Sequence, residues 1–264
     1  VKKFGEGHRF LVRIDAHCGY PDNYVCGLVA AAREHGATSV VVPMVTVGEG
    51  GFQKAAAAAQ NSVLGNGGSA HRRITTGEFV DHGHHALFDL ELYCRVGGYD
   101  EAFSHNEDAE LDQRILAAGG SIWLEPSLAL KYWPRRTPWA LFRQYHGYGR
   151  GRAMNLMRHA APIKLRQAIP VVIAPIALLA MLGLLFAPAN PWTLVLALPA
   201  FGWAALCLGF GALLGMKARS LWVAAAGLAA MISHFAWSAG FLGAVLLRRR
   251  PKAPPQPIGV LCGN

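Results

Sequence analysis

Two ionisable side chains follow the first apolar segment and could bind a divalent cation or a diphosphate. Residues 10–14 are mostly apolar and predict a short strand, and Asp15 and His17 come directly after it. Ligands of open α/β sheets bind beyond the carboxyl ends of strands, so both side chains can face one ion there. The alternative interpretation is a plain turn at the strand end, because Gly19 and Pro21 follow closely.

A second group consists of four acidic residues, Glu107, Asp108, Glu110 and Asp112, at the start of a helix predicted over 107–118 and capped by Asn106. Acids in a first turn stabilise the helix dipole by about 0.3–1 kcal/mol each, which is the structural interpretation. So many carboxylates also repel one another, and we expect this crowding to raise at least one pKa. A raised pKa suits a general base, so this group is a candidate for proton transfer.

Two further groups have a possible chemical role. Residues 143–152 read Arg-Gln-Tyr-His-Gly-Tyr-Gly-Arg-Gly-Arg, which suits a phosphate-bearing, partly apolar substrate and equally suits a basic anchor beside a membrane. Residues 81–85, Asp-His-Gly-His-His, resemble a metal site and allow a metal-dependent hydrolase as one alternative. Zinc needs three or four converging ligands. In a strand, however, His82 and His84 would share one face and His85 would not.

The elements that must position these groups alternate along the chain. Strands are expected over 10–14, 39–44, 78–88, 121–124 and 128–132. Helices are expected over 22–35, 51–62 and 107–118, and an amphipathic helix from residue 138 onward. Such alternation is typical of an α/β domain with a parallel sheet.

Composition and charge point to a membrane protein. The chain has 264 residues, of which 53% are hydrophobic and 16% charged, and its five cysteines show no metal-ligand spacing. Residues 1–130 contain all 16 Asp and Glu with 10 Lys and Arg, whereas residues 131–264 contain 15 Lys and Arg and no acid. Because the basic residues flank apolar runs, we expect contact with membrane lipid and not with nucleic acid.

Three apolar runs, 168–188, 192–215 and 221–247, are each long enough to cross a bilayer. The basic residues before the first run predict a cytoplasmic start, and the uncharged loop 187–191 predicts an outer turn. Lys217 and Arg219 mark the return. A third full span would place Arg248, Arg249, Arg250 and Lys252 outside, against the positive-inside rule. The third run therefore lies partly in the interface, or one run is re-entrant. Residues 158–167 are expected to form an interfacial helix.

Taken together and in order, these groups resemble the family 2 glycosyltransferases, and most of all the succinoglycan-biosynthesis type of bacterial membrane glycosyltransferase. The resemblance also rests on residues 97–101, Gly-Gly-Tyr-Asp-Glu, and on residues 106–112, Asn-Glu-Asp-Ala-Glu-Leu-Asp. It covers nearly the whole chain. It implies a GT-A nucleotide-sugar transferase domain followed by an α-helical membrane region. The first strands of that domain have no counterpart here, which implies an N-terminally truncated chain, inactive by itself.

The resemblance assigns roles residue by residue. Asp15 and His17 match the family's Asp-x-Asp element, with His in place of the second Asp, and would bind Mn²⁺ or Mg²⁺ and the donor diphosphate. Asp108 would be the general base, and Glu107 would orient the acceptor or the base. Gln144 matches the first residue of the family's Gln-x-x-Arg-Trp element. Gly and Tyr stand where Arg and Trp would be, so the charge would come from Arg150 or Arg152.

The function implied is inverting transfer of one sugar from a nucleotide-sugar donor, with a UDP-hexose favoured, to a saccharide on a polyprenyl diphosphate. The divisions implied are a partial catalytic domain over 1–137, interfacial helices over 138–167, a membrane region over 168–247 and a basic tail over 248–264. The location implied is the bacterial inner membrane, with several spans and a cytoplasmic catalytic domain. The alternative from another class is a non-enzymatic membrane scaffold with a degenerate transferase domain.

Overall fold

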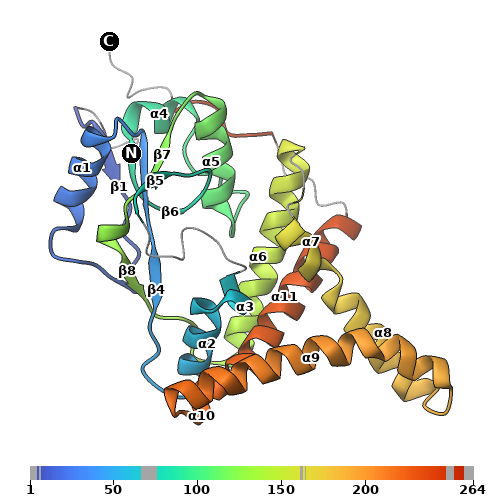
Figure 1. The fold of residues 1–264 in the computed structure, drawn as a ribbon. Helices are drawn as coiled ribbons and strands as arrows, with labels where there is room; N and C mark the ends of the chain where they lie inside the picture. Colours follow the sequence, from blue (N-terminus) through green and yellow to red (C-terminus); the bar gives the residue numbers. More distant parts are fainter. Residues whose placement is uncertain are drawn as a thin grey trace. The chain divides into compact units, whose positions relative to one another are not determined.

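The computed structural model describes residues 5, 7–66, 76–160, 163, 165–247 and 253–258. The chain divides into two compact units, drawn in Figure 1. The first unit comprises Val1–Val45, Gly68–Tyr132 and Pro251–Asn264. The second comprises Thr46–Gly67 and Trp133–Arg250. The chain therefore leaves the first unit twice and returns to it twice.

The first unit is built on a five-stranded mixed sheet in the order β1-β6-β3-β7-β5. The strands are β1 (Phe10–Val12), β6 (His84–Asp89), β3 (Ser39–Val42), β7 (Ile122–Leu124) and β5 (Glu78–Phe79). In this sheet, among the described residues, the pair β3–β7 is parallel, and the neighbours β1–β6, β3–β6 and β5–β7 are antiparallel. The expectation of a parallel sheet is therefore wrong for most pairs of this five-stranded sheet, because apolar periodicity carries no information on strand direction.

A second sheet of the first unit has the order β2-β8-β4, with β2 (Cys18–Gly19), β8 (Leu130–Tyr132) and β4 (Met44–Thr46). One buried cluster joins Leu28 of the first helix to Val40 of β3, together with residues of β6 and β8. A second cluster lies around β6, β7 and α5. The helices of this unit are α1 (Tyr24–Glu34), α4 (Leu90–Arg95), α5 (Glu107–Ala117) and the short 3₁₀ turn η2 (Pro126–Leu128).

Two local expectations need correction. The strand expected over 78–88 is interrupted between β5 and β6, where Gly83 lies so close to the side chain of Val41 that a Cβ atom would overlap it. Asn106 stands before α5 but does not cap it. Its backbone is left-handed, with φ 62°, and its side chain makes no capping hydrogen bond. The start of α5 therefore relies on other contacts, which belong to the site described below.

The second unit is helical. Its helix α6 ends at His159, because Ala160 takes a left-handed conformation, and α7 begins only at Leu165. The single interfacial helix expected over 158–167 is thus wrong. The basic residues 248–250 and 252 lie outside the described residues. The helices are α2 (Gly51–Asn61), α3 (Val63–Asn66), α6 (Pro138–His159), α7 (Leu165–Val171), α8 (Ile173–Phe186), α9 (Pro191–Ala218), α10 (Leu221–Ala224) and α11 (Ala226–Leu246).

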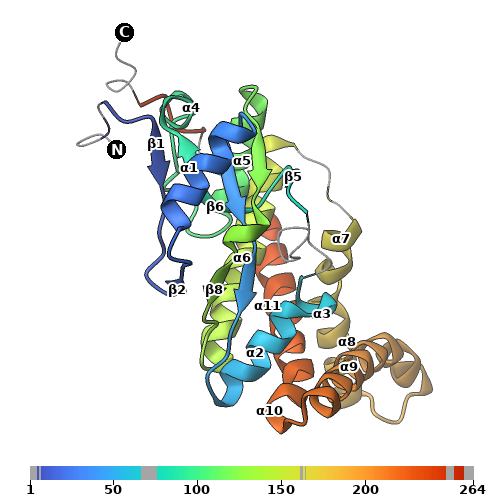
Figure 2. The same ribbon diagram turned by 60° about the vertical axis from the view of Figure 1, so that its left-hand side comes forward.

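Helices α6 and α11 lie side by side, as Figures 1 and 2 both show. Glycines allow this close approach. A Cβ atom at Gly149 of α6 would collide with the backbone of Trp237, and one at Gly240 of α11 would collide with the backbone of His146. Both contacts are made by backbone atoms, which cannot move aside as a flexible side chain can. The pair is therefore fixed in its register by two small residues.

We expect Gly240→Ala to lower the thermal stability of the protein, because overpacking a tight contact costs about 1–3 kcal/mol. The matched control is Gly243→Ala, one turn further along α11, where a Cβ atom meets nothing within 4 Å. That control should be neutral or stabilising by up to about 1 kcal/mol, since Ala favours helix over Gly. Melting curves of both variants in detergent check this. Equal stability of the two variants would contradict the close contact.

Candidate active site

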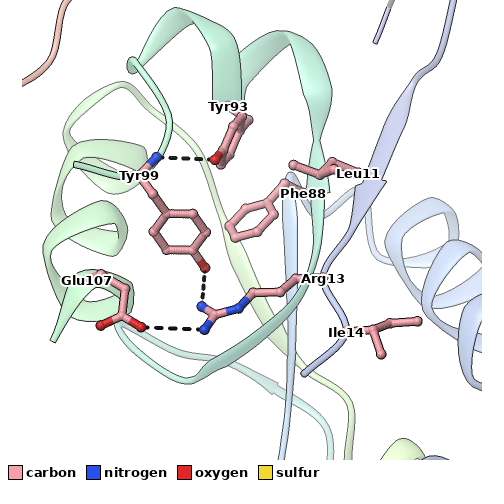
Figure 3. A pocket seen from close by; sticks show the side chains of 7 residues that line it. All are labelled: Leu11, Arg13, Ile14, Phe88, Tyr93, Tyr99 and Glu107. Atoms are coloured by element: carbon pink, nitrogen blue, oxygen red, sulfur yellow. Dashed lines mark hydrogen bonds and ion pairs between the residues drawn. The ribbon is translucent and has the colours of Figure 1, made fainter. Parts of the chain in front are cut away.

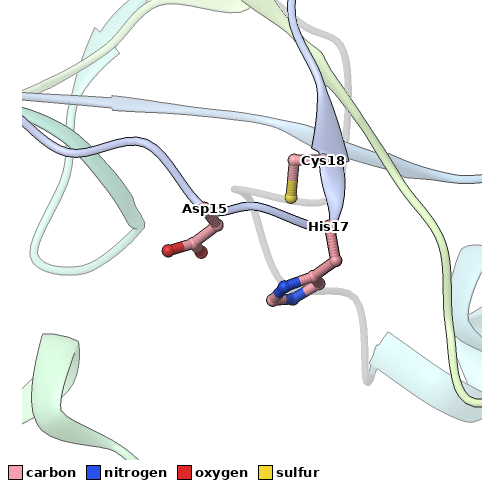
Figure 4. Close-up of side chains that lie close together, drawn as sticks. All are labelled: Asp15, His17 and Cys18. Carbon is pink, nitrogen blue, oxygen red and sulfur yellow. The ribbon is translucent and has the colours of Figure 1, made fainter.

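The loop after β1 brings three potential metal ligands together. Ligand atoms of Asp15, His17 and Cys18 all lie within 4.8 Å of one another (Figure 4). A metal ion needs several ligand atoms close together. Among the described residues, these three side chains are the group of His, Cys, Asp and Glu whose ligand atoms lie close enough to bind one ion. The loop is shaped by Tyr20, whose hydroxyl accepts a hydrogen bond from the amide of Asp15 at 2.6 Å. The sequence-based prediction that Asp15 and His17 lie together is therefore confirmed in its geometry.

Arg13 joins this loop to the acidic start of α5. Its Nε lies 3.2 Å from Oδ1 of Asp15, and its Nη1 lies 2.6 Å from Oδ1 of Asp108. Its Nη2 lies 3.4 Å from Oε1 of Glu107. One guanidinium thus pairs with all three carboxylates that the sequence singled out for metal binding and catalysis. Burial alone would lower the pKa of Arg13, but the carboxylate of Asp108 raises it, so the group stays charged.

Tyr99 completes the support of Asp108. Its hydroxyl accepts a hydrogen bond from Nη1 of Arg13 and donates one to Oδ1 of Asp108, both at 2.7 Å. Burial raises the pKa of Tyr99 well above its usual value, and the neighbouring carboxylate of Asp108 adds to this. The phenol therefore remains protonated and remains a donor. Oδ1 of Asp108 is held by two donors and is fixed in position.

His84, the first residue of β6, lies between the two acids. Its Nε2 is 3.6 Å from Oδ2 of Asp15, and its Nδ1 is 3.8 Å from Oδ2 of Asp108. Both distances exceed that of a hydrogen bond. Asp108 has two carboxylate oxygens. Among the contacts of the described residues, Oδ1 accepts from two close donors, whereas Oδ2 is not engaged by a close donor. A proton from a bound substrate could be received there.

The crowded acids of α5 each face a basic side chain. Glu110 is fully buried and pairs with Arg114 at 2.5 Å, one helical turn away. Asp112 lies 2.5 Å from Nδ1 of His82. The expected rise in a pKa is confirmed for Glu107, where burial raises the pKa and the charge of Asp108 raises it further.

These contacts also bear on the histidine cluster at residues 81–85. His82 pairs with Asp112, while His84 faces Asp15 and Asp108, so the two histidines have different partners. The side chain of His85 lies outside the described part of the structure. Within that part, no group at residues 81–85 brings three ligand atoms to one point. A zinc site built on His82 and His84 gains no support.

A pocket of about 530 Å³ opens beside this network (Figure 3). Glu107 and Arg13 form its polar side, and aromatic and aliphatic side chains form the remainder. Leu11 and Ile14 come from the β1 segment, whereas the aromatic residues come from β6, α4 and the loop before α5. The lining residues are Leu11, Arg13, Ile14, Phe88, Tyr93, Tyr99 and Glu107.

The remaining candidates lie elsewhere in the fold. Gln144, Arg150 and Arg152 belong to α6 and hence to the second unit. Gln144 is buried and donates a hydrogen bond to the hydroxyl of Tyr148 at 3.0 Å. The role of these three residues in donor binding stays a prediction. Arg13 was not found by the sequence reasoning, although it stands two residues before Asp15. His84 was named only as a possible zinc ligand and Tyr99 only as part of the 97–101 motif, so their contacts with Asp108 were not predicted.

Comparison with known proteins gives one extensive match. The chain is 50% identical over 250 residues to the succinoglycan biosynthesis protein ExoA of Rhizobium meliloti (strain 1021). The match covers 95% of the chain and 74% of that protein. No family model matches the chain. Identity at this level over this length means that the two chains share one fold and one family.

Proposed function

Because the chain belongs to the family 2 glycosyltransferases of the succinoglycan-biosynthesis type, we propose that it transfers a hexose from a nucleotide-sugar donor to a lipid-linked saccharide with inversion at the anomeric carbon. The donor is a nucleoside diphosphate sugar, with a UDP-hexose as first candidate. The acceptor is a saccharide on a polyprenyl diphosphate. The observation that supports this most is the joining of Asp15 and Asp108 in one network by Arg13 and His84.

In this mechanism Asp108 is the general base. Oδ2 of Asp108 receives the proton of the acceptor hydroxyl, while Arg13 and Tyr99 hold Oδ1. The acceptor oxygen attacks the anomeric carbon from the side opposite the nucleotide. The bond from that carbon to the diphosphate oxygen breaks, and the nucleoside diphosphate leaves with the electron pair. Glu107 lines the adjoining pocket, where its carboxylate would orient the acceptor or the base.

A divalent cation would be held by Asp15 and His17. The donor set of one carboxylate and one imidazole fits Mn²⁺ better than Mg²⁺, which prefers oxygen ligands alone. Cys18 stands near, but burial raises the pKa of its thiol and so disfavours the thiolate that would bind a metal. When bound, the cation would offset the negative charge that grows on the leaving diphosphate.

We also propose an orientation in the inner membrane. Nucleotide sugars are made in the cytoplasm, so the first unit is expected on that side. Cationic residues of α6 precede the first apolar helix, and the loop after α8, 187–190, has no charge. By the positive-inside rule the chain starts in the cytoplasm and makes its first turn outside.

The test is a transfer assay with membranes that contain the protein. A panel of labelled nucleotide sugars is offered, and lipid-linked product is recovered by organic extraction. We expect one donor to label an acid-labile lipid product, because a glycosyl polyprenyl diphosphate is cleaved by mild acid. No lipid product with any donor would favour the non-enzymatic scaffold. A water-soluble product alone would contradict the acceptor.

A further inference from the structure

We propose that α11 does not cross the membrane: the segment Ala168–Phe186, which comprises the end of α7 and all of α8, forms a transmembrane hairpin with α9, and α11 lies with α6 along the membrane surface on the side of the first unit. The chain has three helices long and apolar enough to cross, Ala168–Phe186, Pro191–Ala218 and Leu221–Leu246. Length and composition therefore allow three spans. The contacts of the described residues exclude three spans and require an even number of crossings.

The first observation is that the chain returns to the first unit after α11. The amide of Ile258 donates a hydrogen bond to the carbonyl of Cys94 at 2.9 Å. The side chain of Ile258 packs on the cluster around β6 and α5. Gly97 lies against the backbone of the same tail, where a Cβ atom would meet the carbonyl oxygen of Pro255 at 2.8 Å.

Because the chain returns to the first unit, it must cross the membrane an even number of times between leaving that unit and rejoining it. The first unit also contains β1 to β8, and a single folded unit cannot be divided by a bilayer. The chain leaves the unit after Tyr132 and rejoins it by residue 253. If three helices crossed, residues 253–258 would lie on the opposite side from the strands that they contact. Two crossings satisfy the contacts, and three do not.

The second observation identifies α11 as the helix that stays on one side. Of the most apolar stretch of Leu221–Leu246, which comprises α10 and α11, 39% is buried within the protein, against 17% for each of the two other candidates. The two others pack on each other as a hairpin and leave most of their apolar surface open to lipid. Because more of its apolar surface is already buried by protein, this helix has less apolar surface to bury in lipid.

The third observation concerns the segment that packs on the first half of α11, which contains α2 and Leu64. Helix α2 has 11 residues, about 16 Å at 1.5 Å per residue, and cannot span the ~30 Å hydrocarbon core. Both ends of its segment lead back into the first unit. In the middle of α11, Nε2 of His234 lies 2.7 Å from the carbonyl oxygen of Leu64, in the same segment. A buried cluster joins α2 to α11 through Ala55, Ala56, Ala59, Ala226, Ala229 and Ala230.

The fourth observation is what covers the second half. Ala153 of α6 packs on Phe241 and Ala244 of α11. Helix α6 also carries four arginines, and a charge at the membrane centre costs about 2.5–3.5 kcal/mol or more. It therefore belongs at the surface, and α11 must lie there beside it. In both views α9 runs across the direction of this pair (Figures 1 and 2).

The surface partner of the pair is an anionic lipid layer. Arg143 and His146 of α6 are exposed, and so is the ring of Trp139 at the start of the helix, at 64%. Tryptophan and cations are typical of the headgroup region. This topology also leaves Arg248, Arg249 and Arg250 on the proposed cytoplasmic side, in agreement with the positive-inside rule.

The test compares three single-cysteine variants of the whole chain in intact and permeabilised cells, with a membrane-impermeant maleimide as the label. Native Cys26 is exposed on α1 and marks the first unit. Ala189→Cys marks the loop between α8 and α9, and Ala253→Cys marks the tail. Both alanines are exposed. The remaining native cysteines are replaced by serine or alanine.

We expect labelling of Ala189→Cys in intact cells, and labelling of Cys26 and Ala253→Cys only after permeabilisation. Labelling of the tail together with the 189 loop, and apart from Cys26, would mean three spans and would overturn the inference. Equal behaviour of all three sites would overturn it too, since no hairpin would cross. The side assigned to the first unit rests on the proposed function. If Cys26 and the tail are labelled outside and the loop is not, the inference holds and the proposed orientation fails.

Discussion

Asp108→Asn is expected to lower the rate of sugar transfer by about 10²-fold or more, the scale of losing a general base. The amide is nearly isosteric with the carboxyl group but cannot receive the acceptor proton. Its oxygen can still accept from Arg13 and Tyr99, which now hold Oδ1 at 2.6 and 2.7 Å. Donor binding should therefore be kept while turnover is lost. Initial rates at saturating donor, with donor affinity measured separately, check this.

A matched control for this variant is Glu34→Gln, which also converts a carboxylate to an amide. Glu34 is exposed at the last residue of α1 in the same unit. It should retain full transfer. Near-normal turnover of Asp108→Asn would show that Asp108 is not the general base. Loss of turnover together with loss of donor affinity would instead indicate a structural role.

Asp15→Ala is expected to abolish metal-dependent donor binding and to reduce transfer by at least about 10²-fold. The carboxylate is a proposed ligand of the cation, and cations stabilise transferring diphosphates by several kcal/mol. The measurement is donor binding and transfer as a function of Mn²⁺ concentration. His17→Asp, which restores the family's Asp-x-Asp pair, should retain activity and shift the preference toward Mg²⁺, a harder ion. Full activity in EDTA would contradict any metal role.

The local parts of the fold were predictable from the sequence because their signals are local. The helices expected over 22–35, 51–62 and 107–118 appear as α1, α2 and α5 with ends displaced by at most two residues. Asp15 and His17 lie together because a two-residue spacing on a tight loop brings side chains close. Charge and apolar runs indicated the membrane region, where the three candidate spans lie.

The network that organises the site was not predictable, because it depends on distant parts of the chain. Arg13 meets Asp108 across 95 residues, and Tyr99 reaches the same carboxylate from another loop. The order of strands in the sheet decides where His84 lies. Both β1 and β3 pair with β6, which begins at His84, and His84 therefore lies between Asp15 and Asp108. Neither strand order nor strand direction is contained in apolar periodicity.

The third apolar run shows the same limit. Hydropathy favoured a span and the basic tail opposed it, so the sequence left two solutions open. What separates them is the contact of Ile258 with Cys94, which joins the tail to a strand-and-helix unit more than 150 residues earlier. Under the proposed topology this non-local contact, and not composition, determines the number of crossings.

The most direct test of the central claim, that Asp15 and Asp108 serve one glycosyl-transfer site, is the transfer of labelled sugar from a nucleotide sugar to extractable lipid. Membranes with the unaltered protein, Asp108→Asn, Asp15→Ala and Glu34→Gln are assayed side by side with Mn²⁺. We predict lipid labelling by the unaltered protein and by Glu34→Gln, and its loss in both aspartate variants. Labelling that survives either aspartate substitution at near-normal rate would contradict the account.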